Sequence, residues 1–312
     1  MPPKKSNPKR KHHELPELYL RGFCDESLSF LWVYERGKPY TPGIKKHKYN
    51  PYRCGVVEIA EKDRYASARP DGTRDFESYE NMLEKIEKPA NDILYKIRSQ
   101  KPINSNEKEF FTTYIQNLHK RTKERDKRIR PILDKNQKIQ SRQLNNYASL
   151  FALNGHFKTA KEYYDVAKHL ESDDVKKNIY LESMITLYPK LHETIKSMSW
   201  KFHVAANDSY FVTSNAPVTF DPVGLSISPL LFPVSKKIAL IATHNDEETD
   251  LEFKNASSAE TLIINFYTII SATSVYAPKQ ESWVWEILEH GLAMTENQSF
   301  VFGKLFPFRT SG

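Results

Sequence analysis

Residues 76–97 read FESYENMLEKIEKPANDILYKI, and this stretch decides the fold class of the chain. Its apolar side chains recur at intervals of three and four residues, a spacing that places them on one face of a helix. The residues of this face are Phe76, Tyr79, Leu83, Ile86, Ala90, Ile93 and Ile97. Pro89 has no amide hydrogen to donate and is expected to kink the helix, which should end at Lys101 and Pro102.

The same periodicity continues downstream and predicts a long helical hairpin. Its second helix begins with Phe110 to Leu118, enters a basic stretch and is expected to stop near Pro131. Further helices are predicted at 142–153, 157–170 and 174–198. The body of the protein is therefore expected to be mostly helical.

Short segments of β-type pattern at both ends of the chain predict a small mixed sheet, so the expected fold class is α+β. The N-terminal strands are predicted at 30–34 and 55–59. After the helices, residues 200–204 and 210–212 are typical of a hairpin, because Trp200, Phe202 and Val204 alternate before a turn at Asn207. The remaining expected elements are strands at 230–234, 237–243 and 300–308 and helices at 256–276 and 281–292.

Length and composition limit the class of protein. The chain has 312 residues, 39% of them hydrophobic, which is enough for a sizeable core. Residues 1–11 are expected to be a disordered basic tail. Residues 12–312 are expected to form a single domain, with a motif and strands in 12–75, helices in 76–198 and a mixed region in 199–312. Only 10 Gly are present, and no Walker-type or GxGxxG pattern occurs, which argues against a dinucleotide-binding fold.

The termini, the cysteines and the uncharged segments favour a cytoplasmic protein with no membrane partner. Met1 to Arg10 is polar and basic, without the apolar segment of a signal peptide. Cys24 and Cys54 lie far apart and are expected to be reduced. The longest uncharged run begins at Thr261 and contains several polar residues, so it lacks the roughly 20 apolar residues that a bilayer requires.

Positive charge is concentrated in two segments. The net charge is +7, the first eleven residues carry +5, and residues 119–142 contain ten Lys and Arg against three Asp and Glu. Basic segments on an otherwise acidic chain are typical of proteins that contact polyanions, here RNA or DNA. The alternative is a solvated helix face beside a flexible tail. The candidate contact residues are Lys120, Arg121, Arg125, Arg128 and Arg130, of which Arg121, Arg125 and Arg128 recur at helical spacing.

An opening motif carries a family resemblance. Residues 12–23 read HHELPELYLRGF, which resembles the HHxxPxxYLRxF motif of the domain-of-unknown-function family 4238. The resemblance extends over nearly the whole chain. Five later segments fit in order: the early strand at 31–34, a glutamate-bearing helix from Phe76-Glu77 to Ile86-Glu87, Arg121 on the following helix, TSNAPV at 213–218 and LFPVS at 231–235.

Two positions depart from the family pattern. Asn215-Ala216-Pro217 stands where the family has Asp-Asn-Pro, so a carboxylate is missing from that segment. Leu118 stands where the family often has a glutamine, three residues before the helix arginine, and Gln116 is the nearest glutamine. A catalytic role that depends on either position is therefore in question for this chain.

The matched residues form a chemically coherent set. The candidate catalytic residues are His12, His13, Glu77, Arg121 and Asn215. An imidazole can act as acid or base near neutral pH, and an arginine fork suits phosphate or carboxylate. Together with a carboxylate, these groups fit phosphodiester cleavage, with or without a divalent metal ion as cofactor. The structural alternative is a buried Glu77–Arg121 ion pair that joins two helices, with His13 capping the core. No histidine pair has zinc-ligand spacing, so no metal ligand is assigned.

Three functional hypotheses follow. The first is a nucleic-acid-directed hydrolase, a nuclease that could serve as a toxic effector in prokaryotic defence. The second is a non-catalytic module that binds nucleic acid or a partner through its basic helix. The third is a hydrolase of a small phosphorylated or carboxylated ligand gripped by Arg121. The sequence leaves the substrate, the oligomeric state and the existence of enzymatic activity open.

Overall fold

The computed structural model describes residues 11–12, 15–25, 29–41, 48–59, 61–62, 67–68, 74–75, 78–206, 208–220, 229–244 and 250–291. The chain forms two compact units. Unit 1 comprises residues 1–12, 61–86 and 123–187, and unit 2 comprises residues 13–60, 87–122 and 188–312. The expectation of one domain over 12–312 stays a prediction, and residues 1–10 of the predicted tail lie outside the described residues.

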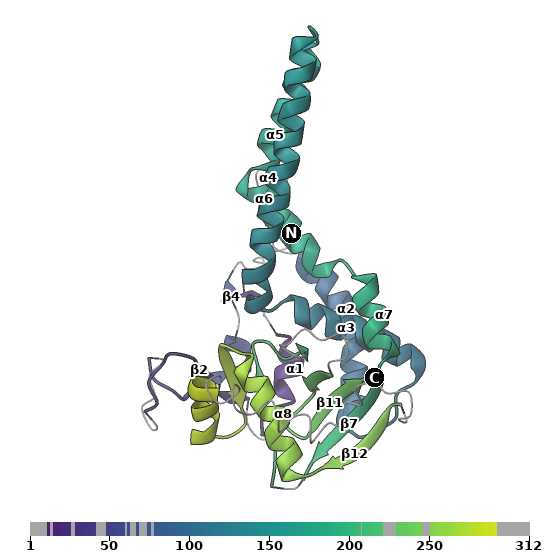
Figure 1. The fold of residues 1–312 in the computed structure, drawn as a ribbon. Helices are drawn as coiled ribbons and strands as arrows, with labels where there is room; N and C mark the ends of the chain where they lie inside the picture. The colour runs from purple at the N-terminus through teal and green to yellow at the C-terminus, as the bar shows by residue number, and fades with distance from the viewer. Residues whose placement is uncertain are drawn as a thin grey trace, which may run out of the picture. The chain divides into compact units, whose positions relative to one another are not determined.

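Unit 1 contains a long antiparallel pair of helices, α4 (Lys123–Leu153) and α5 (Phe157–Leu170), which lie side by side (Figure 1). Gln137 Nε2 donates to the carbonyl of Leu170 at 3.2 Å, and Ser141 Oγ donates to the carbonyl of Ala167 at 3.3 Å. Gly155 reverses the chain between them with a φ of 79°, a conformation that favours glycine at a helix C-terminus.

The rest of unit 1 packs around the start of α2 (Ser78–Arg98) and α6 (Asp173–Ile185). Its apolar cluster consists of Tyr79, Leu83, Tyr180, Leu181 and Met184. Two short antiparallel strand pairs complete the described part of this unit. They join β1 (Lys11–His12) to β4 (Glu61–Lys62) and β5 (Ser67–Ala68) to β6 (Arg74–Asp75).

The helix boundaries correct three predictions. Pro131 does not end a helix but lies inside α4, on an exposed face where water can satisfy the carbonyl of Lys127 that loses its donor. The helix that was expected to run through Arg121 and Arg125 is instead divided, because α3 (Ser105–Lys120) ends before α4 begins. The predicted helix at 174–198 is also divided, into α6 and α7 (Pro189–Ser197). The cause is Pro189, since the residue before a proline disfavours helical geometry.

Unit 2 contains a five-stranded sheet in the order β12-β7-β11-β10-β9, in which only the β12–β7 pair is parallel among the described strands. The strands are β7 (Ser199–Ala205), β9 (Thr219–Phe220), β10 (Leu230–Pro233), β11 (Ile238–Thr243) and β12 (Glu252–Ala256). Phe111 of α3 packs on one face, against Trp200 and Phe232. Ile264 of α8 (Ser258–Ile270) packs on the other face with Leu231. Because both faces are covered, β10 and β11 are apolar without alternation.

A second, antiparallel sheet of unit 2 has the order β3-β2-β13-β8. Its strands are β2 (Phe30–Glu35), β3 (Tyr52–Gly55), β8 (Thr213–Ser214) and β13 (Ser274–Ala277). The α+β class is confirmed, and this sheet does combine N-terminal and C-terminal strands as predicted. The expectation of one small mixed sheet is wrong, because the C-terminal strands also build the separate five-stranded sheet.

Three local predictions in unit 2 are also wrong. Residues 210–212 do not form a hairpin with β7, which pairs instead with β11 and β12. The helix expected at 256–276 ends at Ile270, and its last residues form strand β13. Residues 56–59 are not a strand, since β3 ends at Gly55 and the short 3-10 helix η1 (Val56–Glu58) follows. Residues 282–291 are helical as predicted, while the strand expected at 300–308 lies outside the described residues.

The predicted helical hairpin is present where α2 and α3 run antiparallel within unit 2. Two ion pairs join the helices, Lys96 to Glu107 at 2.5 Å and Arg121 to Glu87. The short helix α1 (Glu17–Arg21) carries the opening motif. Among the described residues, no helix combines the length and apolar character needed to cross a membrane.

Candidate functional site

The opening motif is anchored in the core of unit 2 by Tyr19, which is fully buried. Tyr19 Oη donates to the carbonyl of Pro233 at 2.7 Å and lies 2.7 Å from Thr213 Oγ1. Because a phenol has one proton, the Thr213 hydroxyl is then the donor of that pair. The first motif therefore contacts both later segments of the family resemblance, those that contain Thr213 and Pro233.

Arg98, at the end of α2, holds the same region together through backbone carbonyls. Its guanidinium donates to Leu18 O at 3.1 Å, to Tyr19 O at 3.1 Å and to Val234 O at 3.2 Å. Burial lowers the pKa of Arg98 from its ordinary value. Gly22 is required here by close approach, since a Cβ at this position would overlap the guanidinium.

Tyr114 on α3 places a second phenol beside this cluster. Its side chain is 1% exposed, and its hydroxyl has no hydrogen-bond partner among the described residues. Burial, followed by the negative charge of Glu87, raises the pKa of Tyr114 well above its usual value. Burial likewise raises the pKa of Tyr19. Both phenols stay neutral at physiological pH, so neither can act there as a general base.

Arg121 occupies the C-cap of α3 and forms a buried ion pair. Its side chain is 2% exposed, and Nη1 donates to Oε1 of Glu87, whose side chain is 25% exposed. The structural alternative in the sequence analysis pairs Arg121 with Glu77, which lies outside the described residues, so that pairing stays a prediction. An ion pair between α2 and α3 is the arrangement of the structural alternative, with Glu87 as the carboxylate.

Lys120 is buried beside Arg121 and is not available on the surface. Its side chain is 1% exposed, and Nζ lies 3.9 Å from the centre of the Tyr188 ring. Gln116 positions that ring, because its amide donates to Tyr188 O at 2.9 Å and accepts from Tyr188 N at 3.1 Å. The nearest glutamine to the family position therefore has a contact that ties α3 to the start of α7.

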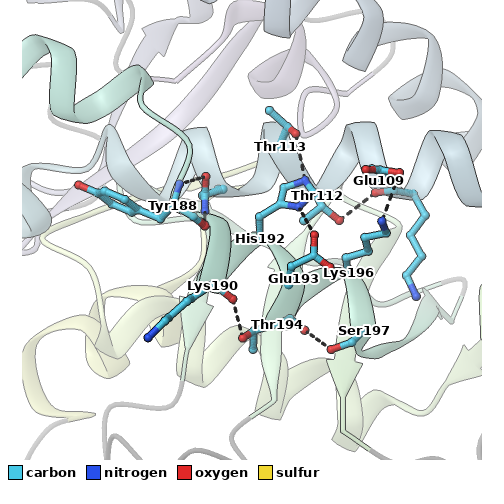
Figure 2. Close-up of polar contacts among 12 residues, drawn as sticks. Glu109, Thr112, Thr113, Tyr188, Lys190, His192, Glu193, Thr194, Lys196 and Ser197 are labelled. Atoms are coloured by element: carbon cyan, nitrogen blue, oxygen red, sulfur yellow. Dashed lines mark hydrogen bonds and ion pairs between the residues drawn. The ribbon is translucent and has the colours of Figure 1, made fainter.

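A buried histidine lies in the seam between α3 and α7, as Figure 2 shows. His192 Nε2 is 3.3 Å from Thr113 Oγ1, and Nδ1 is 3.6 Å from Glu193 Oε1. The order hydroxyl, imidazole, carboxylate is that of a nucleophile relay. The 3.6 Å separation exceeds hydrogen-bond distance, however, and the Glu193 side chain is 70% exposed. Together with the Lys196–Glu109 ion pair, these contacts fasten α7 to α3.

Asn215 follows β8 and binds the start of β13. Its Oδ1 accepts from Thr273 N at 3.1 Å and Ser274 N at 3.0 Å, and its Nδ2 donates to Thr273 Oγ1 at 2.8 Å. The side chain is 2% exposed. These contacts saturate the amide oxygen and hold two segments of the four-stranded sheet together. The catalytic role predicted for Asn215 stays a prediction.

The histidine pair of the opening motif is only partly described. His12 ends β1, where its Cα pairs with that of Glu61, and its side chain lies outside the described residues. His13 lies outside them as well. No group of three or more His, Cys, Asp or Glu side chains in the described part of the chain is placed to hold a metal ion. The assembly of His12, His13 and Glu77 with Arg121 and Asn215 into one site therefore stays a prediction.

The predicted basic contact residues divide into buried and exposed members. Arg125 is 8% exposed, and Lys120 and Arg121 are also buried. Arg128 and Arg130 are exposed on α4, and the Arg130 guanidinium lies 3.9 Å from the centre of the Tyr180 ring. Three further exposed cations follow on α4, namely Lys135, Lys138 and Arg142. Their charge belongs to the basic stretch at 119–142, and their spacing from Arg128 in the sequence is the signal that places them on the same side of α4.

The comparisons with known proteins add one finding. The family described as "Protein of unknown function (DUF4238)" matches residues 11–280, which is most of the chain. Neither proteins of curated function nor solved structures show a match to this sequence. The match spans the opening motif, both helical pairs and both sheets of the described residues. This chain therefore belongs to the DUF4238 family.

Proposed function

We propose that this protein binds nucleic acid through a cationic stripe on α4. The stripe consists of Arg128, Lys135, Lys138 and Arg142, all exposed. Their positions i, i+7, i+10 and i+14 fall on one side of a helix and extend over about 21 Å of its axis. A row of cations of this length matches a phosphate backbone better than a small anion.

The position of the stripe supports ligand contact. Gln137, which bonds to α5, is nine residues from Arg128, or two and a half turns, so α5 packs on the opposite side of α4. None of the four cations has an ion pair with a described residue. No Asp or Glu occurs from Lys135 to Lys161 in the sequence. The repulsion among these charges is therefore left for a polyanion to relieve.

Binding is favoured over hydrolysis by the contacts of the candidate catalytic residues. Arg121 is paired with Glu87, and the amide of Asn215 is engaged with Thr273 and Ser274. A group that is already bound and buried has less capacity to act on a phosphodiester. The hydrolase hypothesis, with His13 as acid or base, remains as an outcome of the experiment.

The experiment measures the affinity of the full chain for labelled RNA and DNA across a salt series. Binding should weaken steeply as salt rises. Replacing the four stripe cations by Gln should reduce the slope of log K against log salt by about 3. The control replaces four exposed lysines elsewhere, Lys85, Lys88, Lys101 and Lys190, because it removes equal charge. Equal losses in both variants, or no binding at low salt, contradict the proposal.

The same samples test for hydrolysis. Intact RNA and DNA after long incubation, with and without a divalent metal ion, identify a binding protein. Cleavage that His13→Ala abolishes, with unchanged melting temperature, would establish the nuclease hypothesis instead.

A further inference from the structure

We propose that the outward flank of α5 binds single-stranded nucleic acid, an inference that rests on the proposed function and names its ligand class. The flank carries Phe157, Lys161, Tyr164 and Lys168. These residues occupy positions i, i+4, i+7 and i+11, so an aromatic ring and a lysine alternate along one side of the helix. The row extends over about 16 Å of the helix axis.

The row is exposed and is not needed for packing. Phe157 is 72% exposed and Tyr164 is 56% exposed. The side of α5 that packs on α4 is formed by other residues, since Ala160 and Ala167 are buried and Tyr163 stacks on Phe151 with the ring centres 5.3 Å apart. Two exposed rings of this size cost solvation free energy without contributing to the described core.

The charges of the row are positive and form no ion pair within the described part of the chain. Lys161 and Lys168 are exposed, and neither forms an ion pair with a described residue. Glu162 is displaced by about 100° from Lys161, whereas Asp165, four residues after Lys161 and three before Lys168, borders the row on one flank. The row itself therefore consists of two rings and two lysines, with Asp165 as the carboxylate beside it.

The alternation matches the chemistry of a single strand. Rings stack on unpaired bases, and lysines between them neutralise successive phosphates. In a duplex the base faces are already stacked on one another, so the rings have nothing to cover. The α4 stripe accounts for attraction to any nucleic acid, whereas the α5 row accounts for a preference for a single strand over a duplex.

The experiment compares a labelled single strand with a duplex of equal length, using the full chain. Phe157→Ala and Tyr164→Ala should each weaken single-strand binding roughly 5- to 150-fold. Duplex binding should change by less than about twofold, because no ring contact is lost. Tyr95→Ala is the matched control, since Tyr95 is 66% exposed and has Lys101 Nζ 5.8 Å from its ring centre.

Leucine substitutions keep the inference testable if the alanine variants fold poorly. Leucine retains apolar volume but has no ring, so Phe157→Leu and Tyr164→Leu should lose single-strand affinity and keep their circular dichroism spectrum. The inference would be overturned if the leucine variants bind single strands as tightly as the unmodified chain. In that case, binding to anionic phosphatidylglycerol vesicles, or dimerisation in sedimentation, would identify the ligand of the row instead. Equal affinity for the single strand and the duplex would also overturn the inference, while binding would still depend on the four stripe cations of α4. If the unmodified chain binds neither form of nucleic acid, the proposed function itself is overturned.

Discussion

The cations of unit 2 and those of α4 carry the same charge in opposite surroundings. Arg98 donates to three carbonyls, Lys108 donates to Met198 O and Asp250 Oδ2 at 2.7 Å, and Arg121 is paired with Glu87. The stripe cations on α4 have no ion pair to a described residue. A partly buried cation must be paired to offset its desolvation, whereas an exposed one need not be. The comparison separates cations that hold the fold from cations that can hold a ligand.

The largest effect is expected for Arg98, the cation with three carbonyl partners. Arg98→Ala leaves the carbonyls of Leu18, Tyr19 and Val234 without this donor and should lower the free energy of unfolding by about 3 to 4 kcal/mol. Gly22→Ala should act in the same direction, because its Cβ displaces the guanidinium. Urea denaturation measures both. If each variant loses less than about 1 kcal/mol of unfolding free energy, Arg98 is not one of the cations that hold the fold.

The next effect concerns a buried base rather than a paired cation. His203 on β7 is 2% exposed, and its Nδ1 has no hydrogen-bond partner in the part of the chain that the structure describes. Burial, and then Lys254, lowers its pKa from 6.5 to about 4. The unfolded chain therefore binds the proton first as pH falls. The free energy of unfolding should be unaffected above pH 6.5 and should fall by about 3 kcal/mol between pH 6.5 and 4.

Comparison with His203→Gln isolates this titration from that of the carboxylates. The difference in urea midpoint between the two proteins should change with pH only in the window from 6.5 to 4. A difference that is flat across this window would mean that His203 titrates alike in the folded and unfolded states.

Substitution of Asn215 tests whether a residue predicted to be catalytic instead stabilises the fold. Asn215→Ala removes the clamp on Thr273 and Ser274 and should cost about 2 kcal/mol of unfolding free energy. Thermal and urea unfolding measure this loss. If the unfolding free energy is unchanged while nucleic-acid hydrolysis disappears, Asn215 is a catalytic residue and not a structural one.

The smallest effect on stability is expected for the stripe. Arg128→Ala should change the unfolding free energy by no more than about 0.5 kcal/mol, because an exposed side chain without an ion pair contributes little. It should nevertheless weaken nucleic-acid binding and its salt dependence. A destabilisation of more than about 1 kcal/mol would show that Arg128 has a structural partner.

Much of the fold was predictable because local patterns dominate helices. The periodicity of residues 76–97 indicated α2, and that of 157–170 matches α5. Sheet pairing was not predictable, since β7 joins strands that lie more than thirty residues downstream, at 238–243 and 252–256. The short strand β13 was predicted as helix because Thr261 to Ala277 is uncharged throughout, and only its pairing with β2 distinguishes it.

The candidate site shows the same division. The basic stretch was predictable from the sequence, since residues 119–142 carry ten Lys and Arg. It did not separate buried Lys120, Arg121 and Arg125 from exposed Arg128 and Arg130. That distinction depends on the division between α3 and α4 and on the residues that cover each cation.

The sequence by itself determined the helical body, the α+β class, the family and the total positive charge, because each follows from residue type and local spacing. The tertiary structure alone decided which strands pair and which cations are enclosed. It also decided that Tyr19 contacts Thr213 and Pro233. The physical reason is that burial and pairing are properties of neighbours in space, and residues as far apart as 19 and 233 become neighbours only when the chain folds.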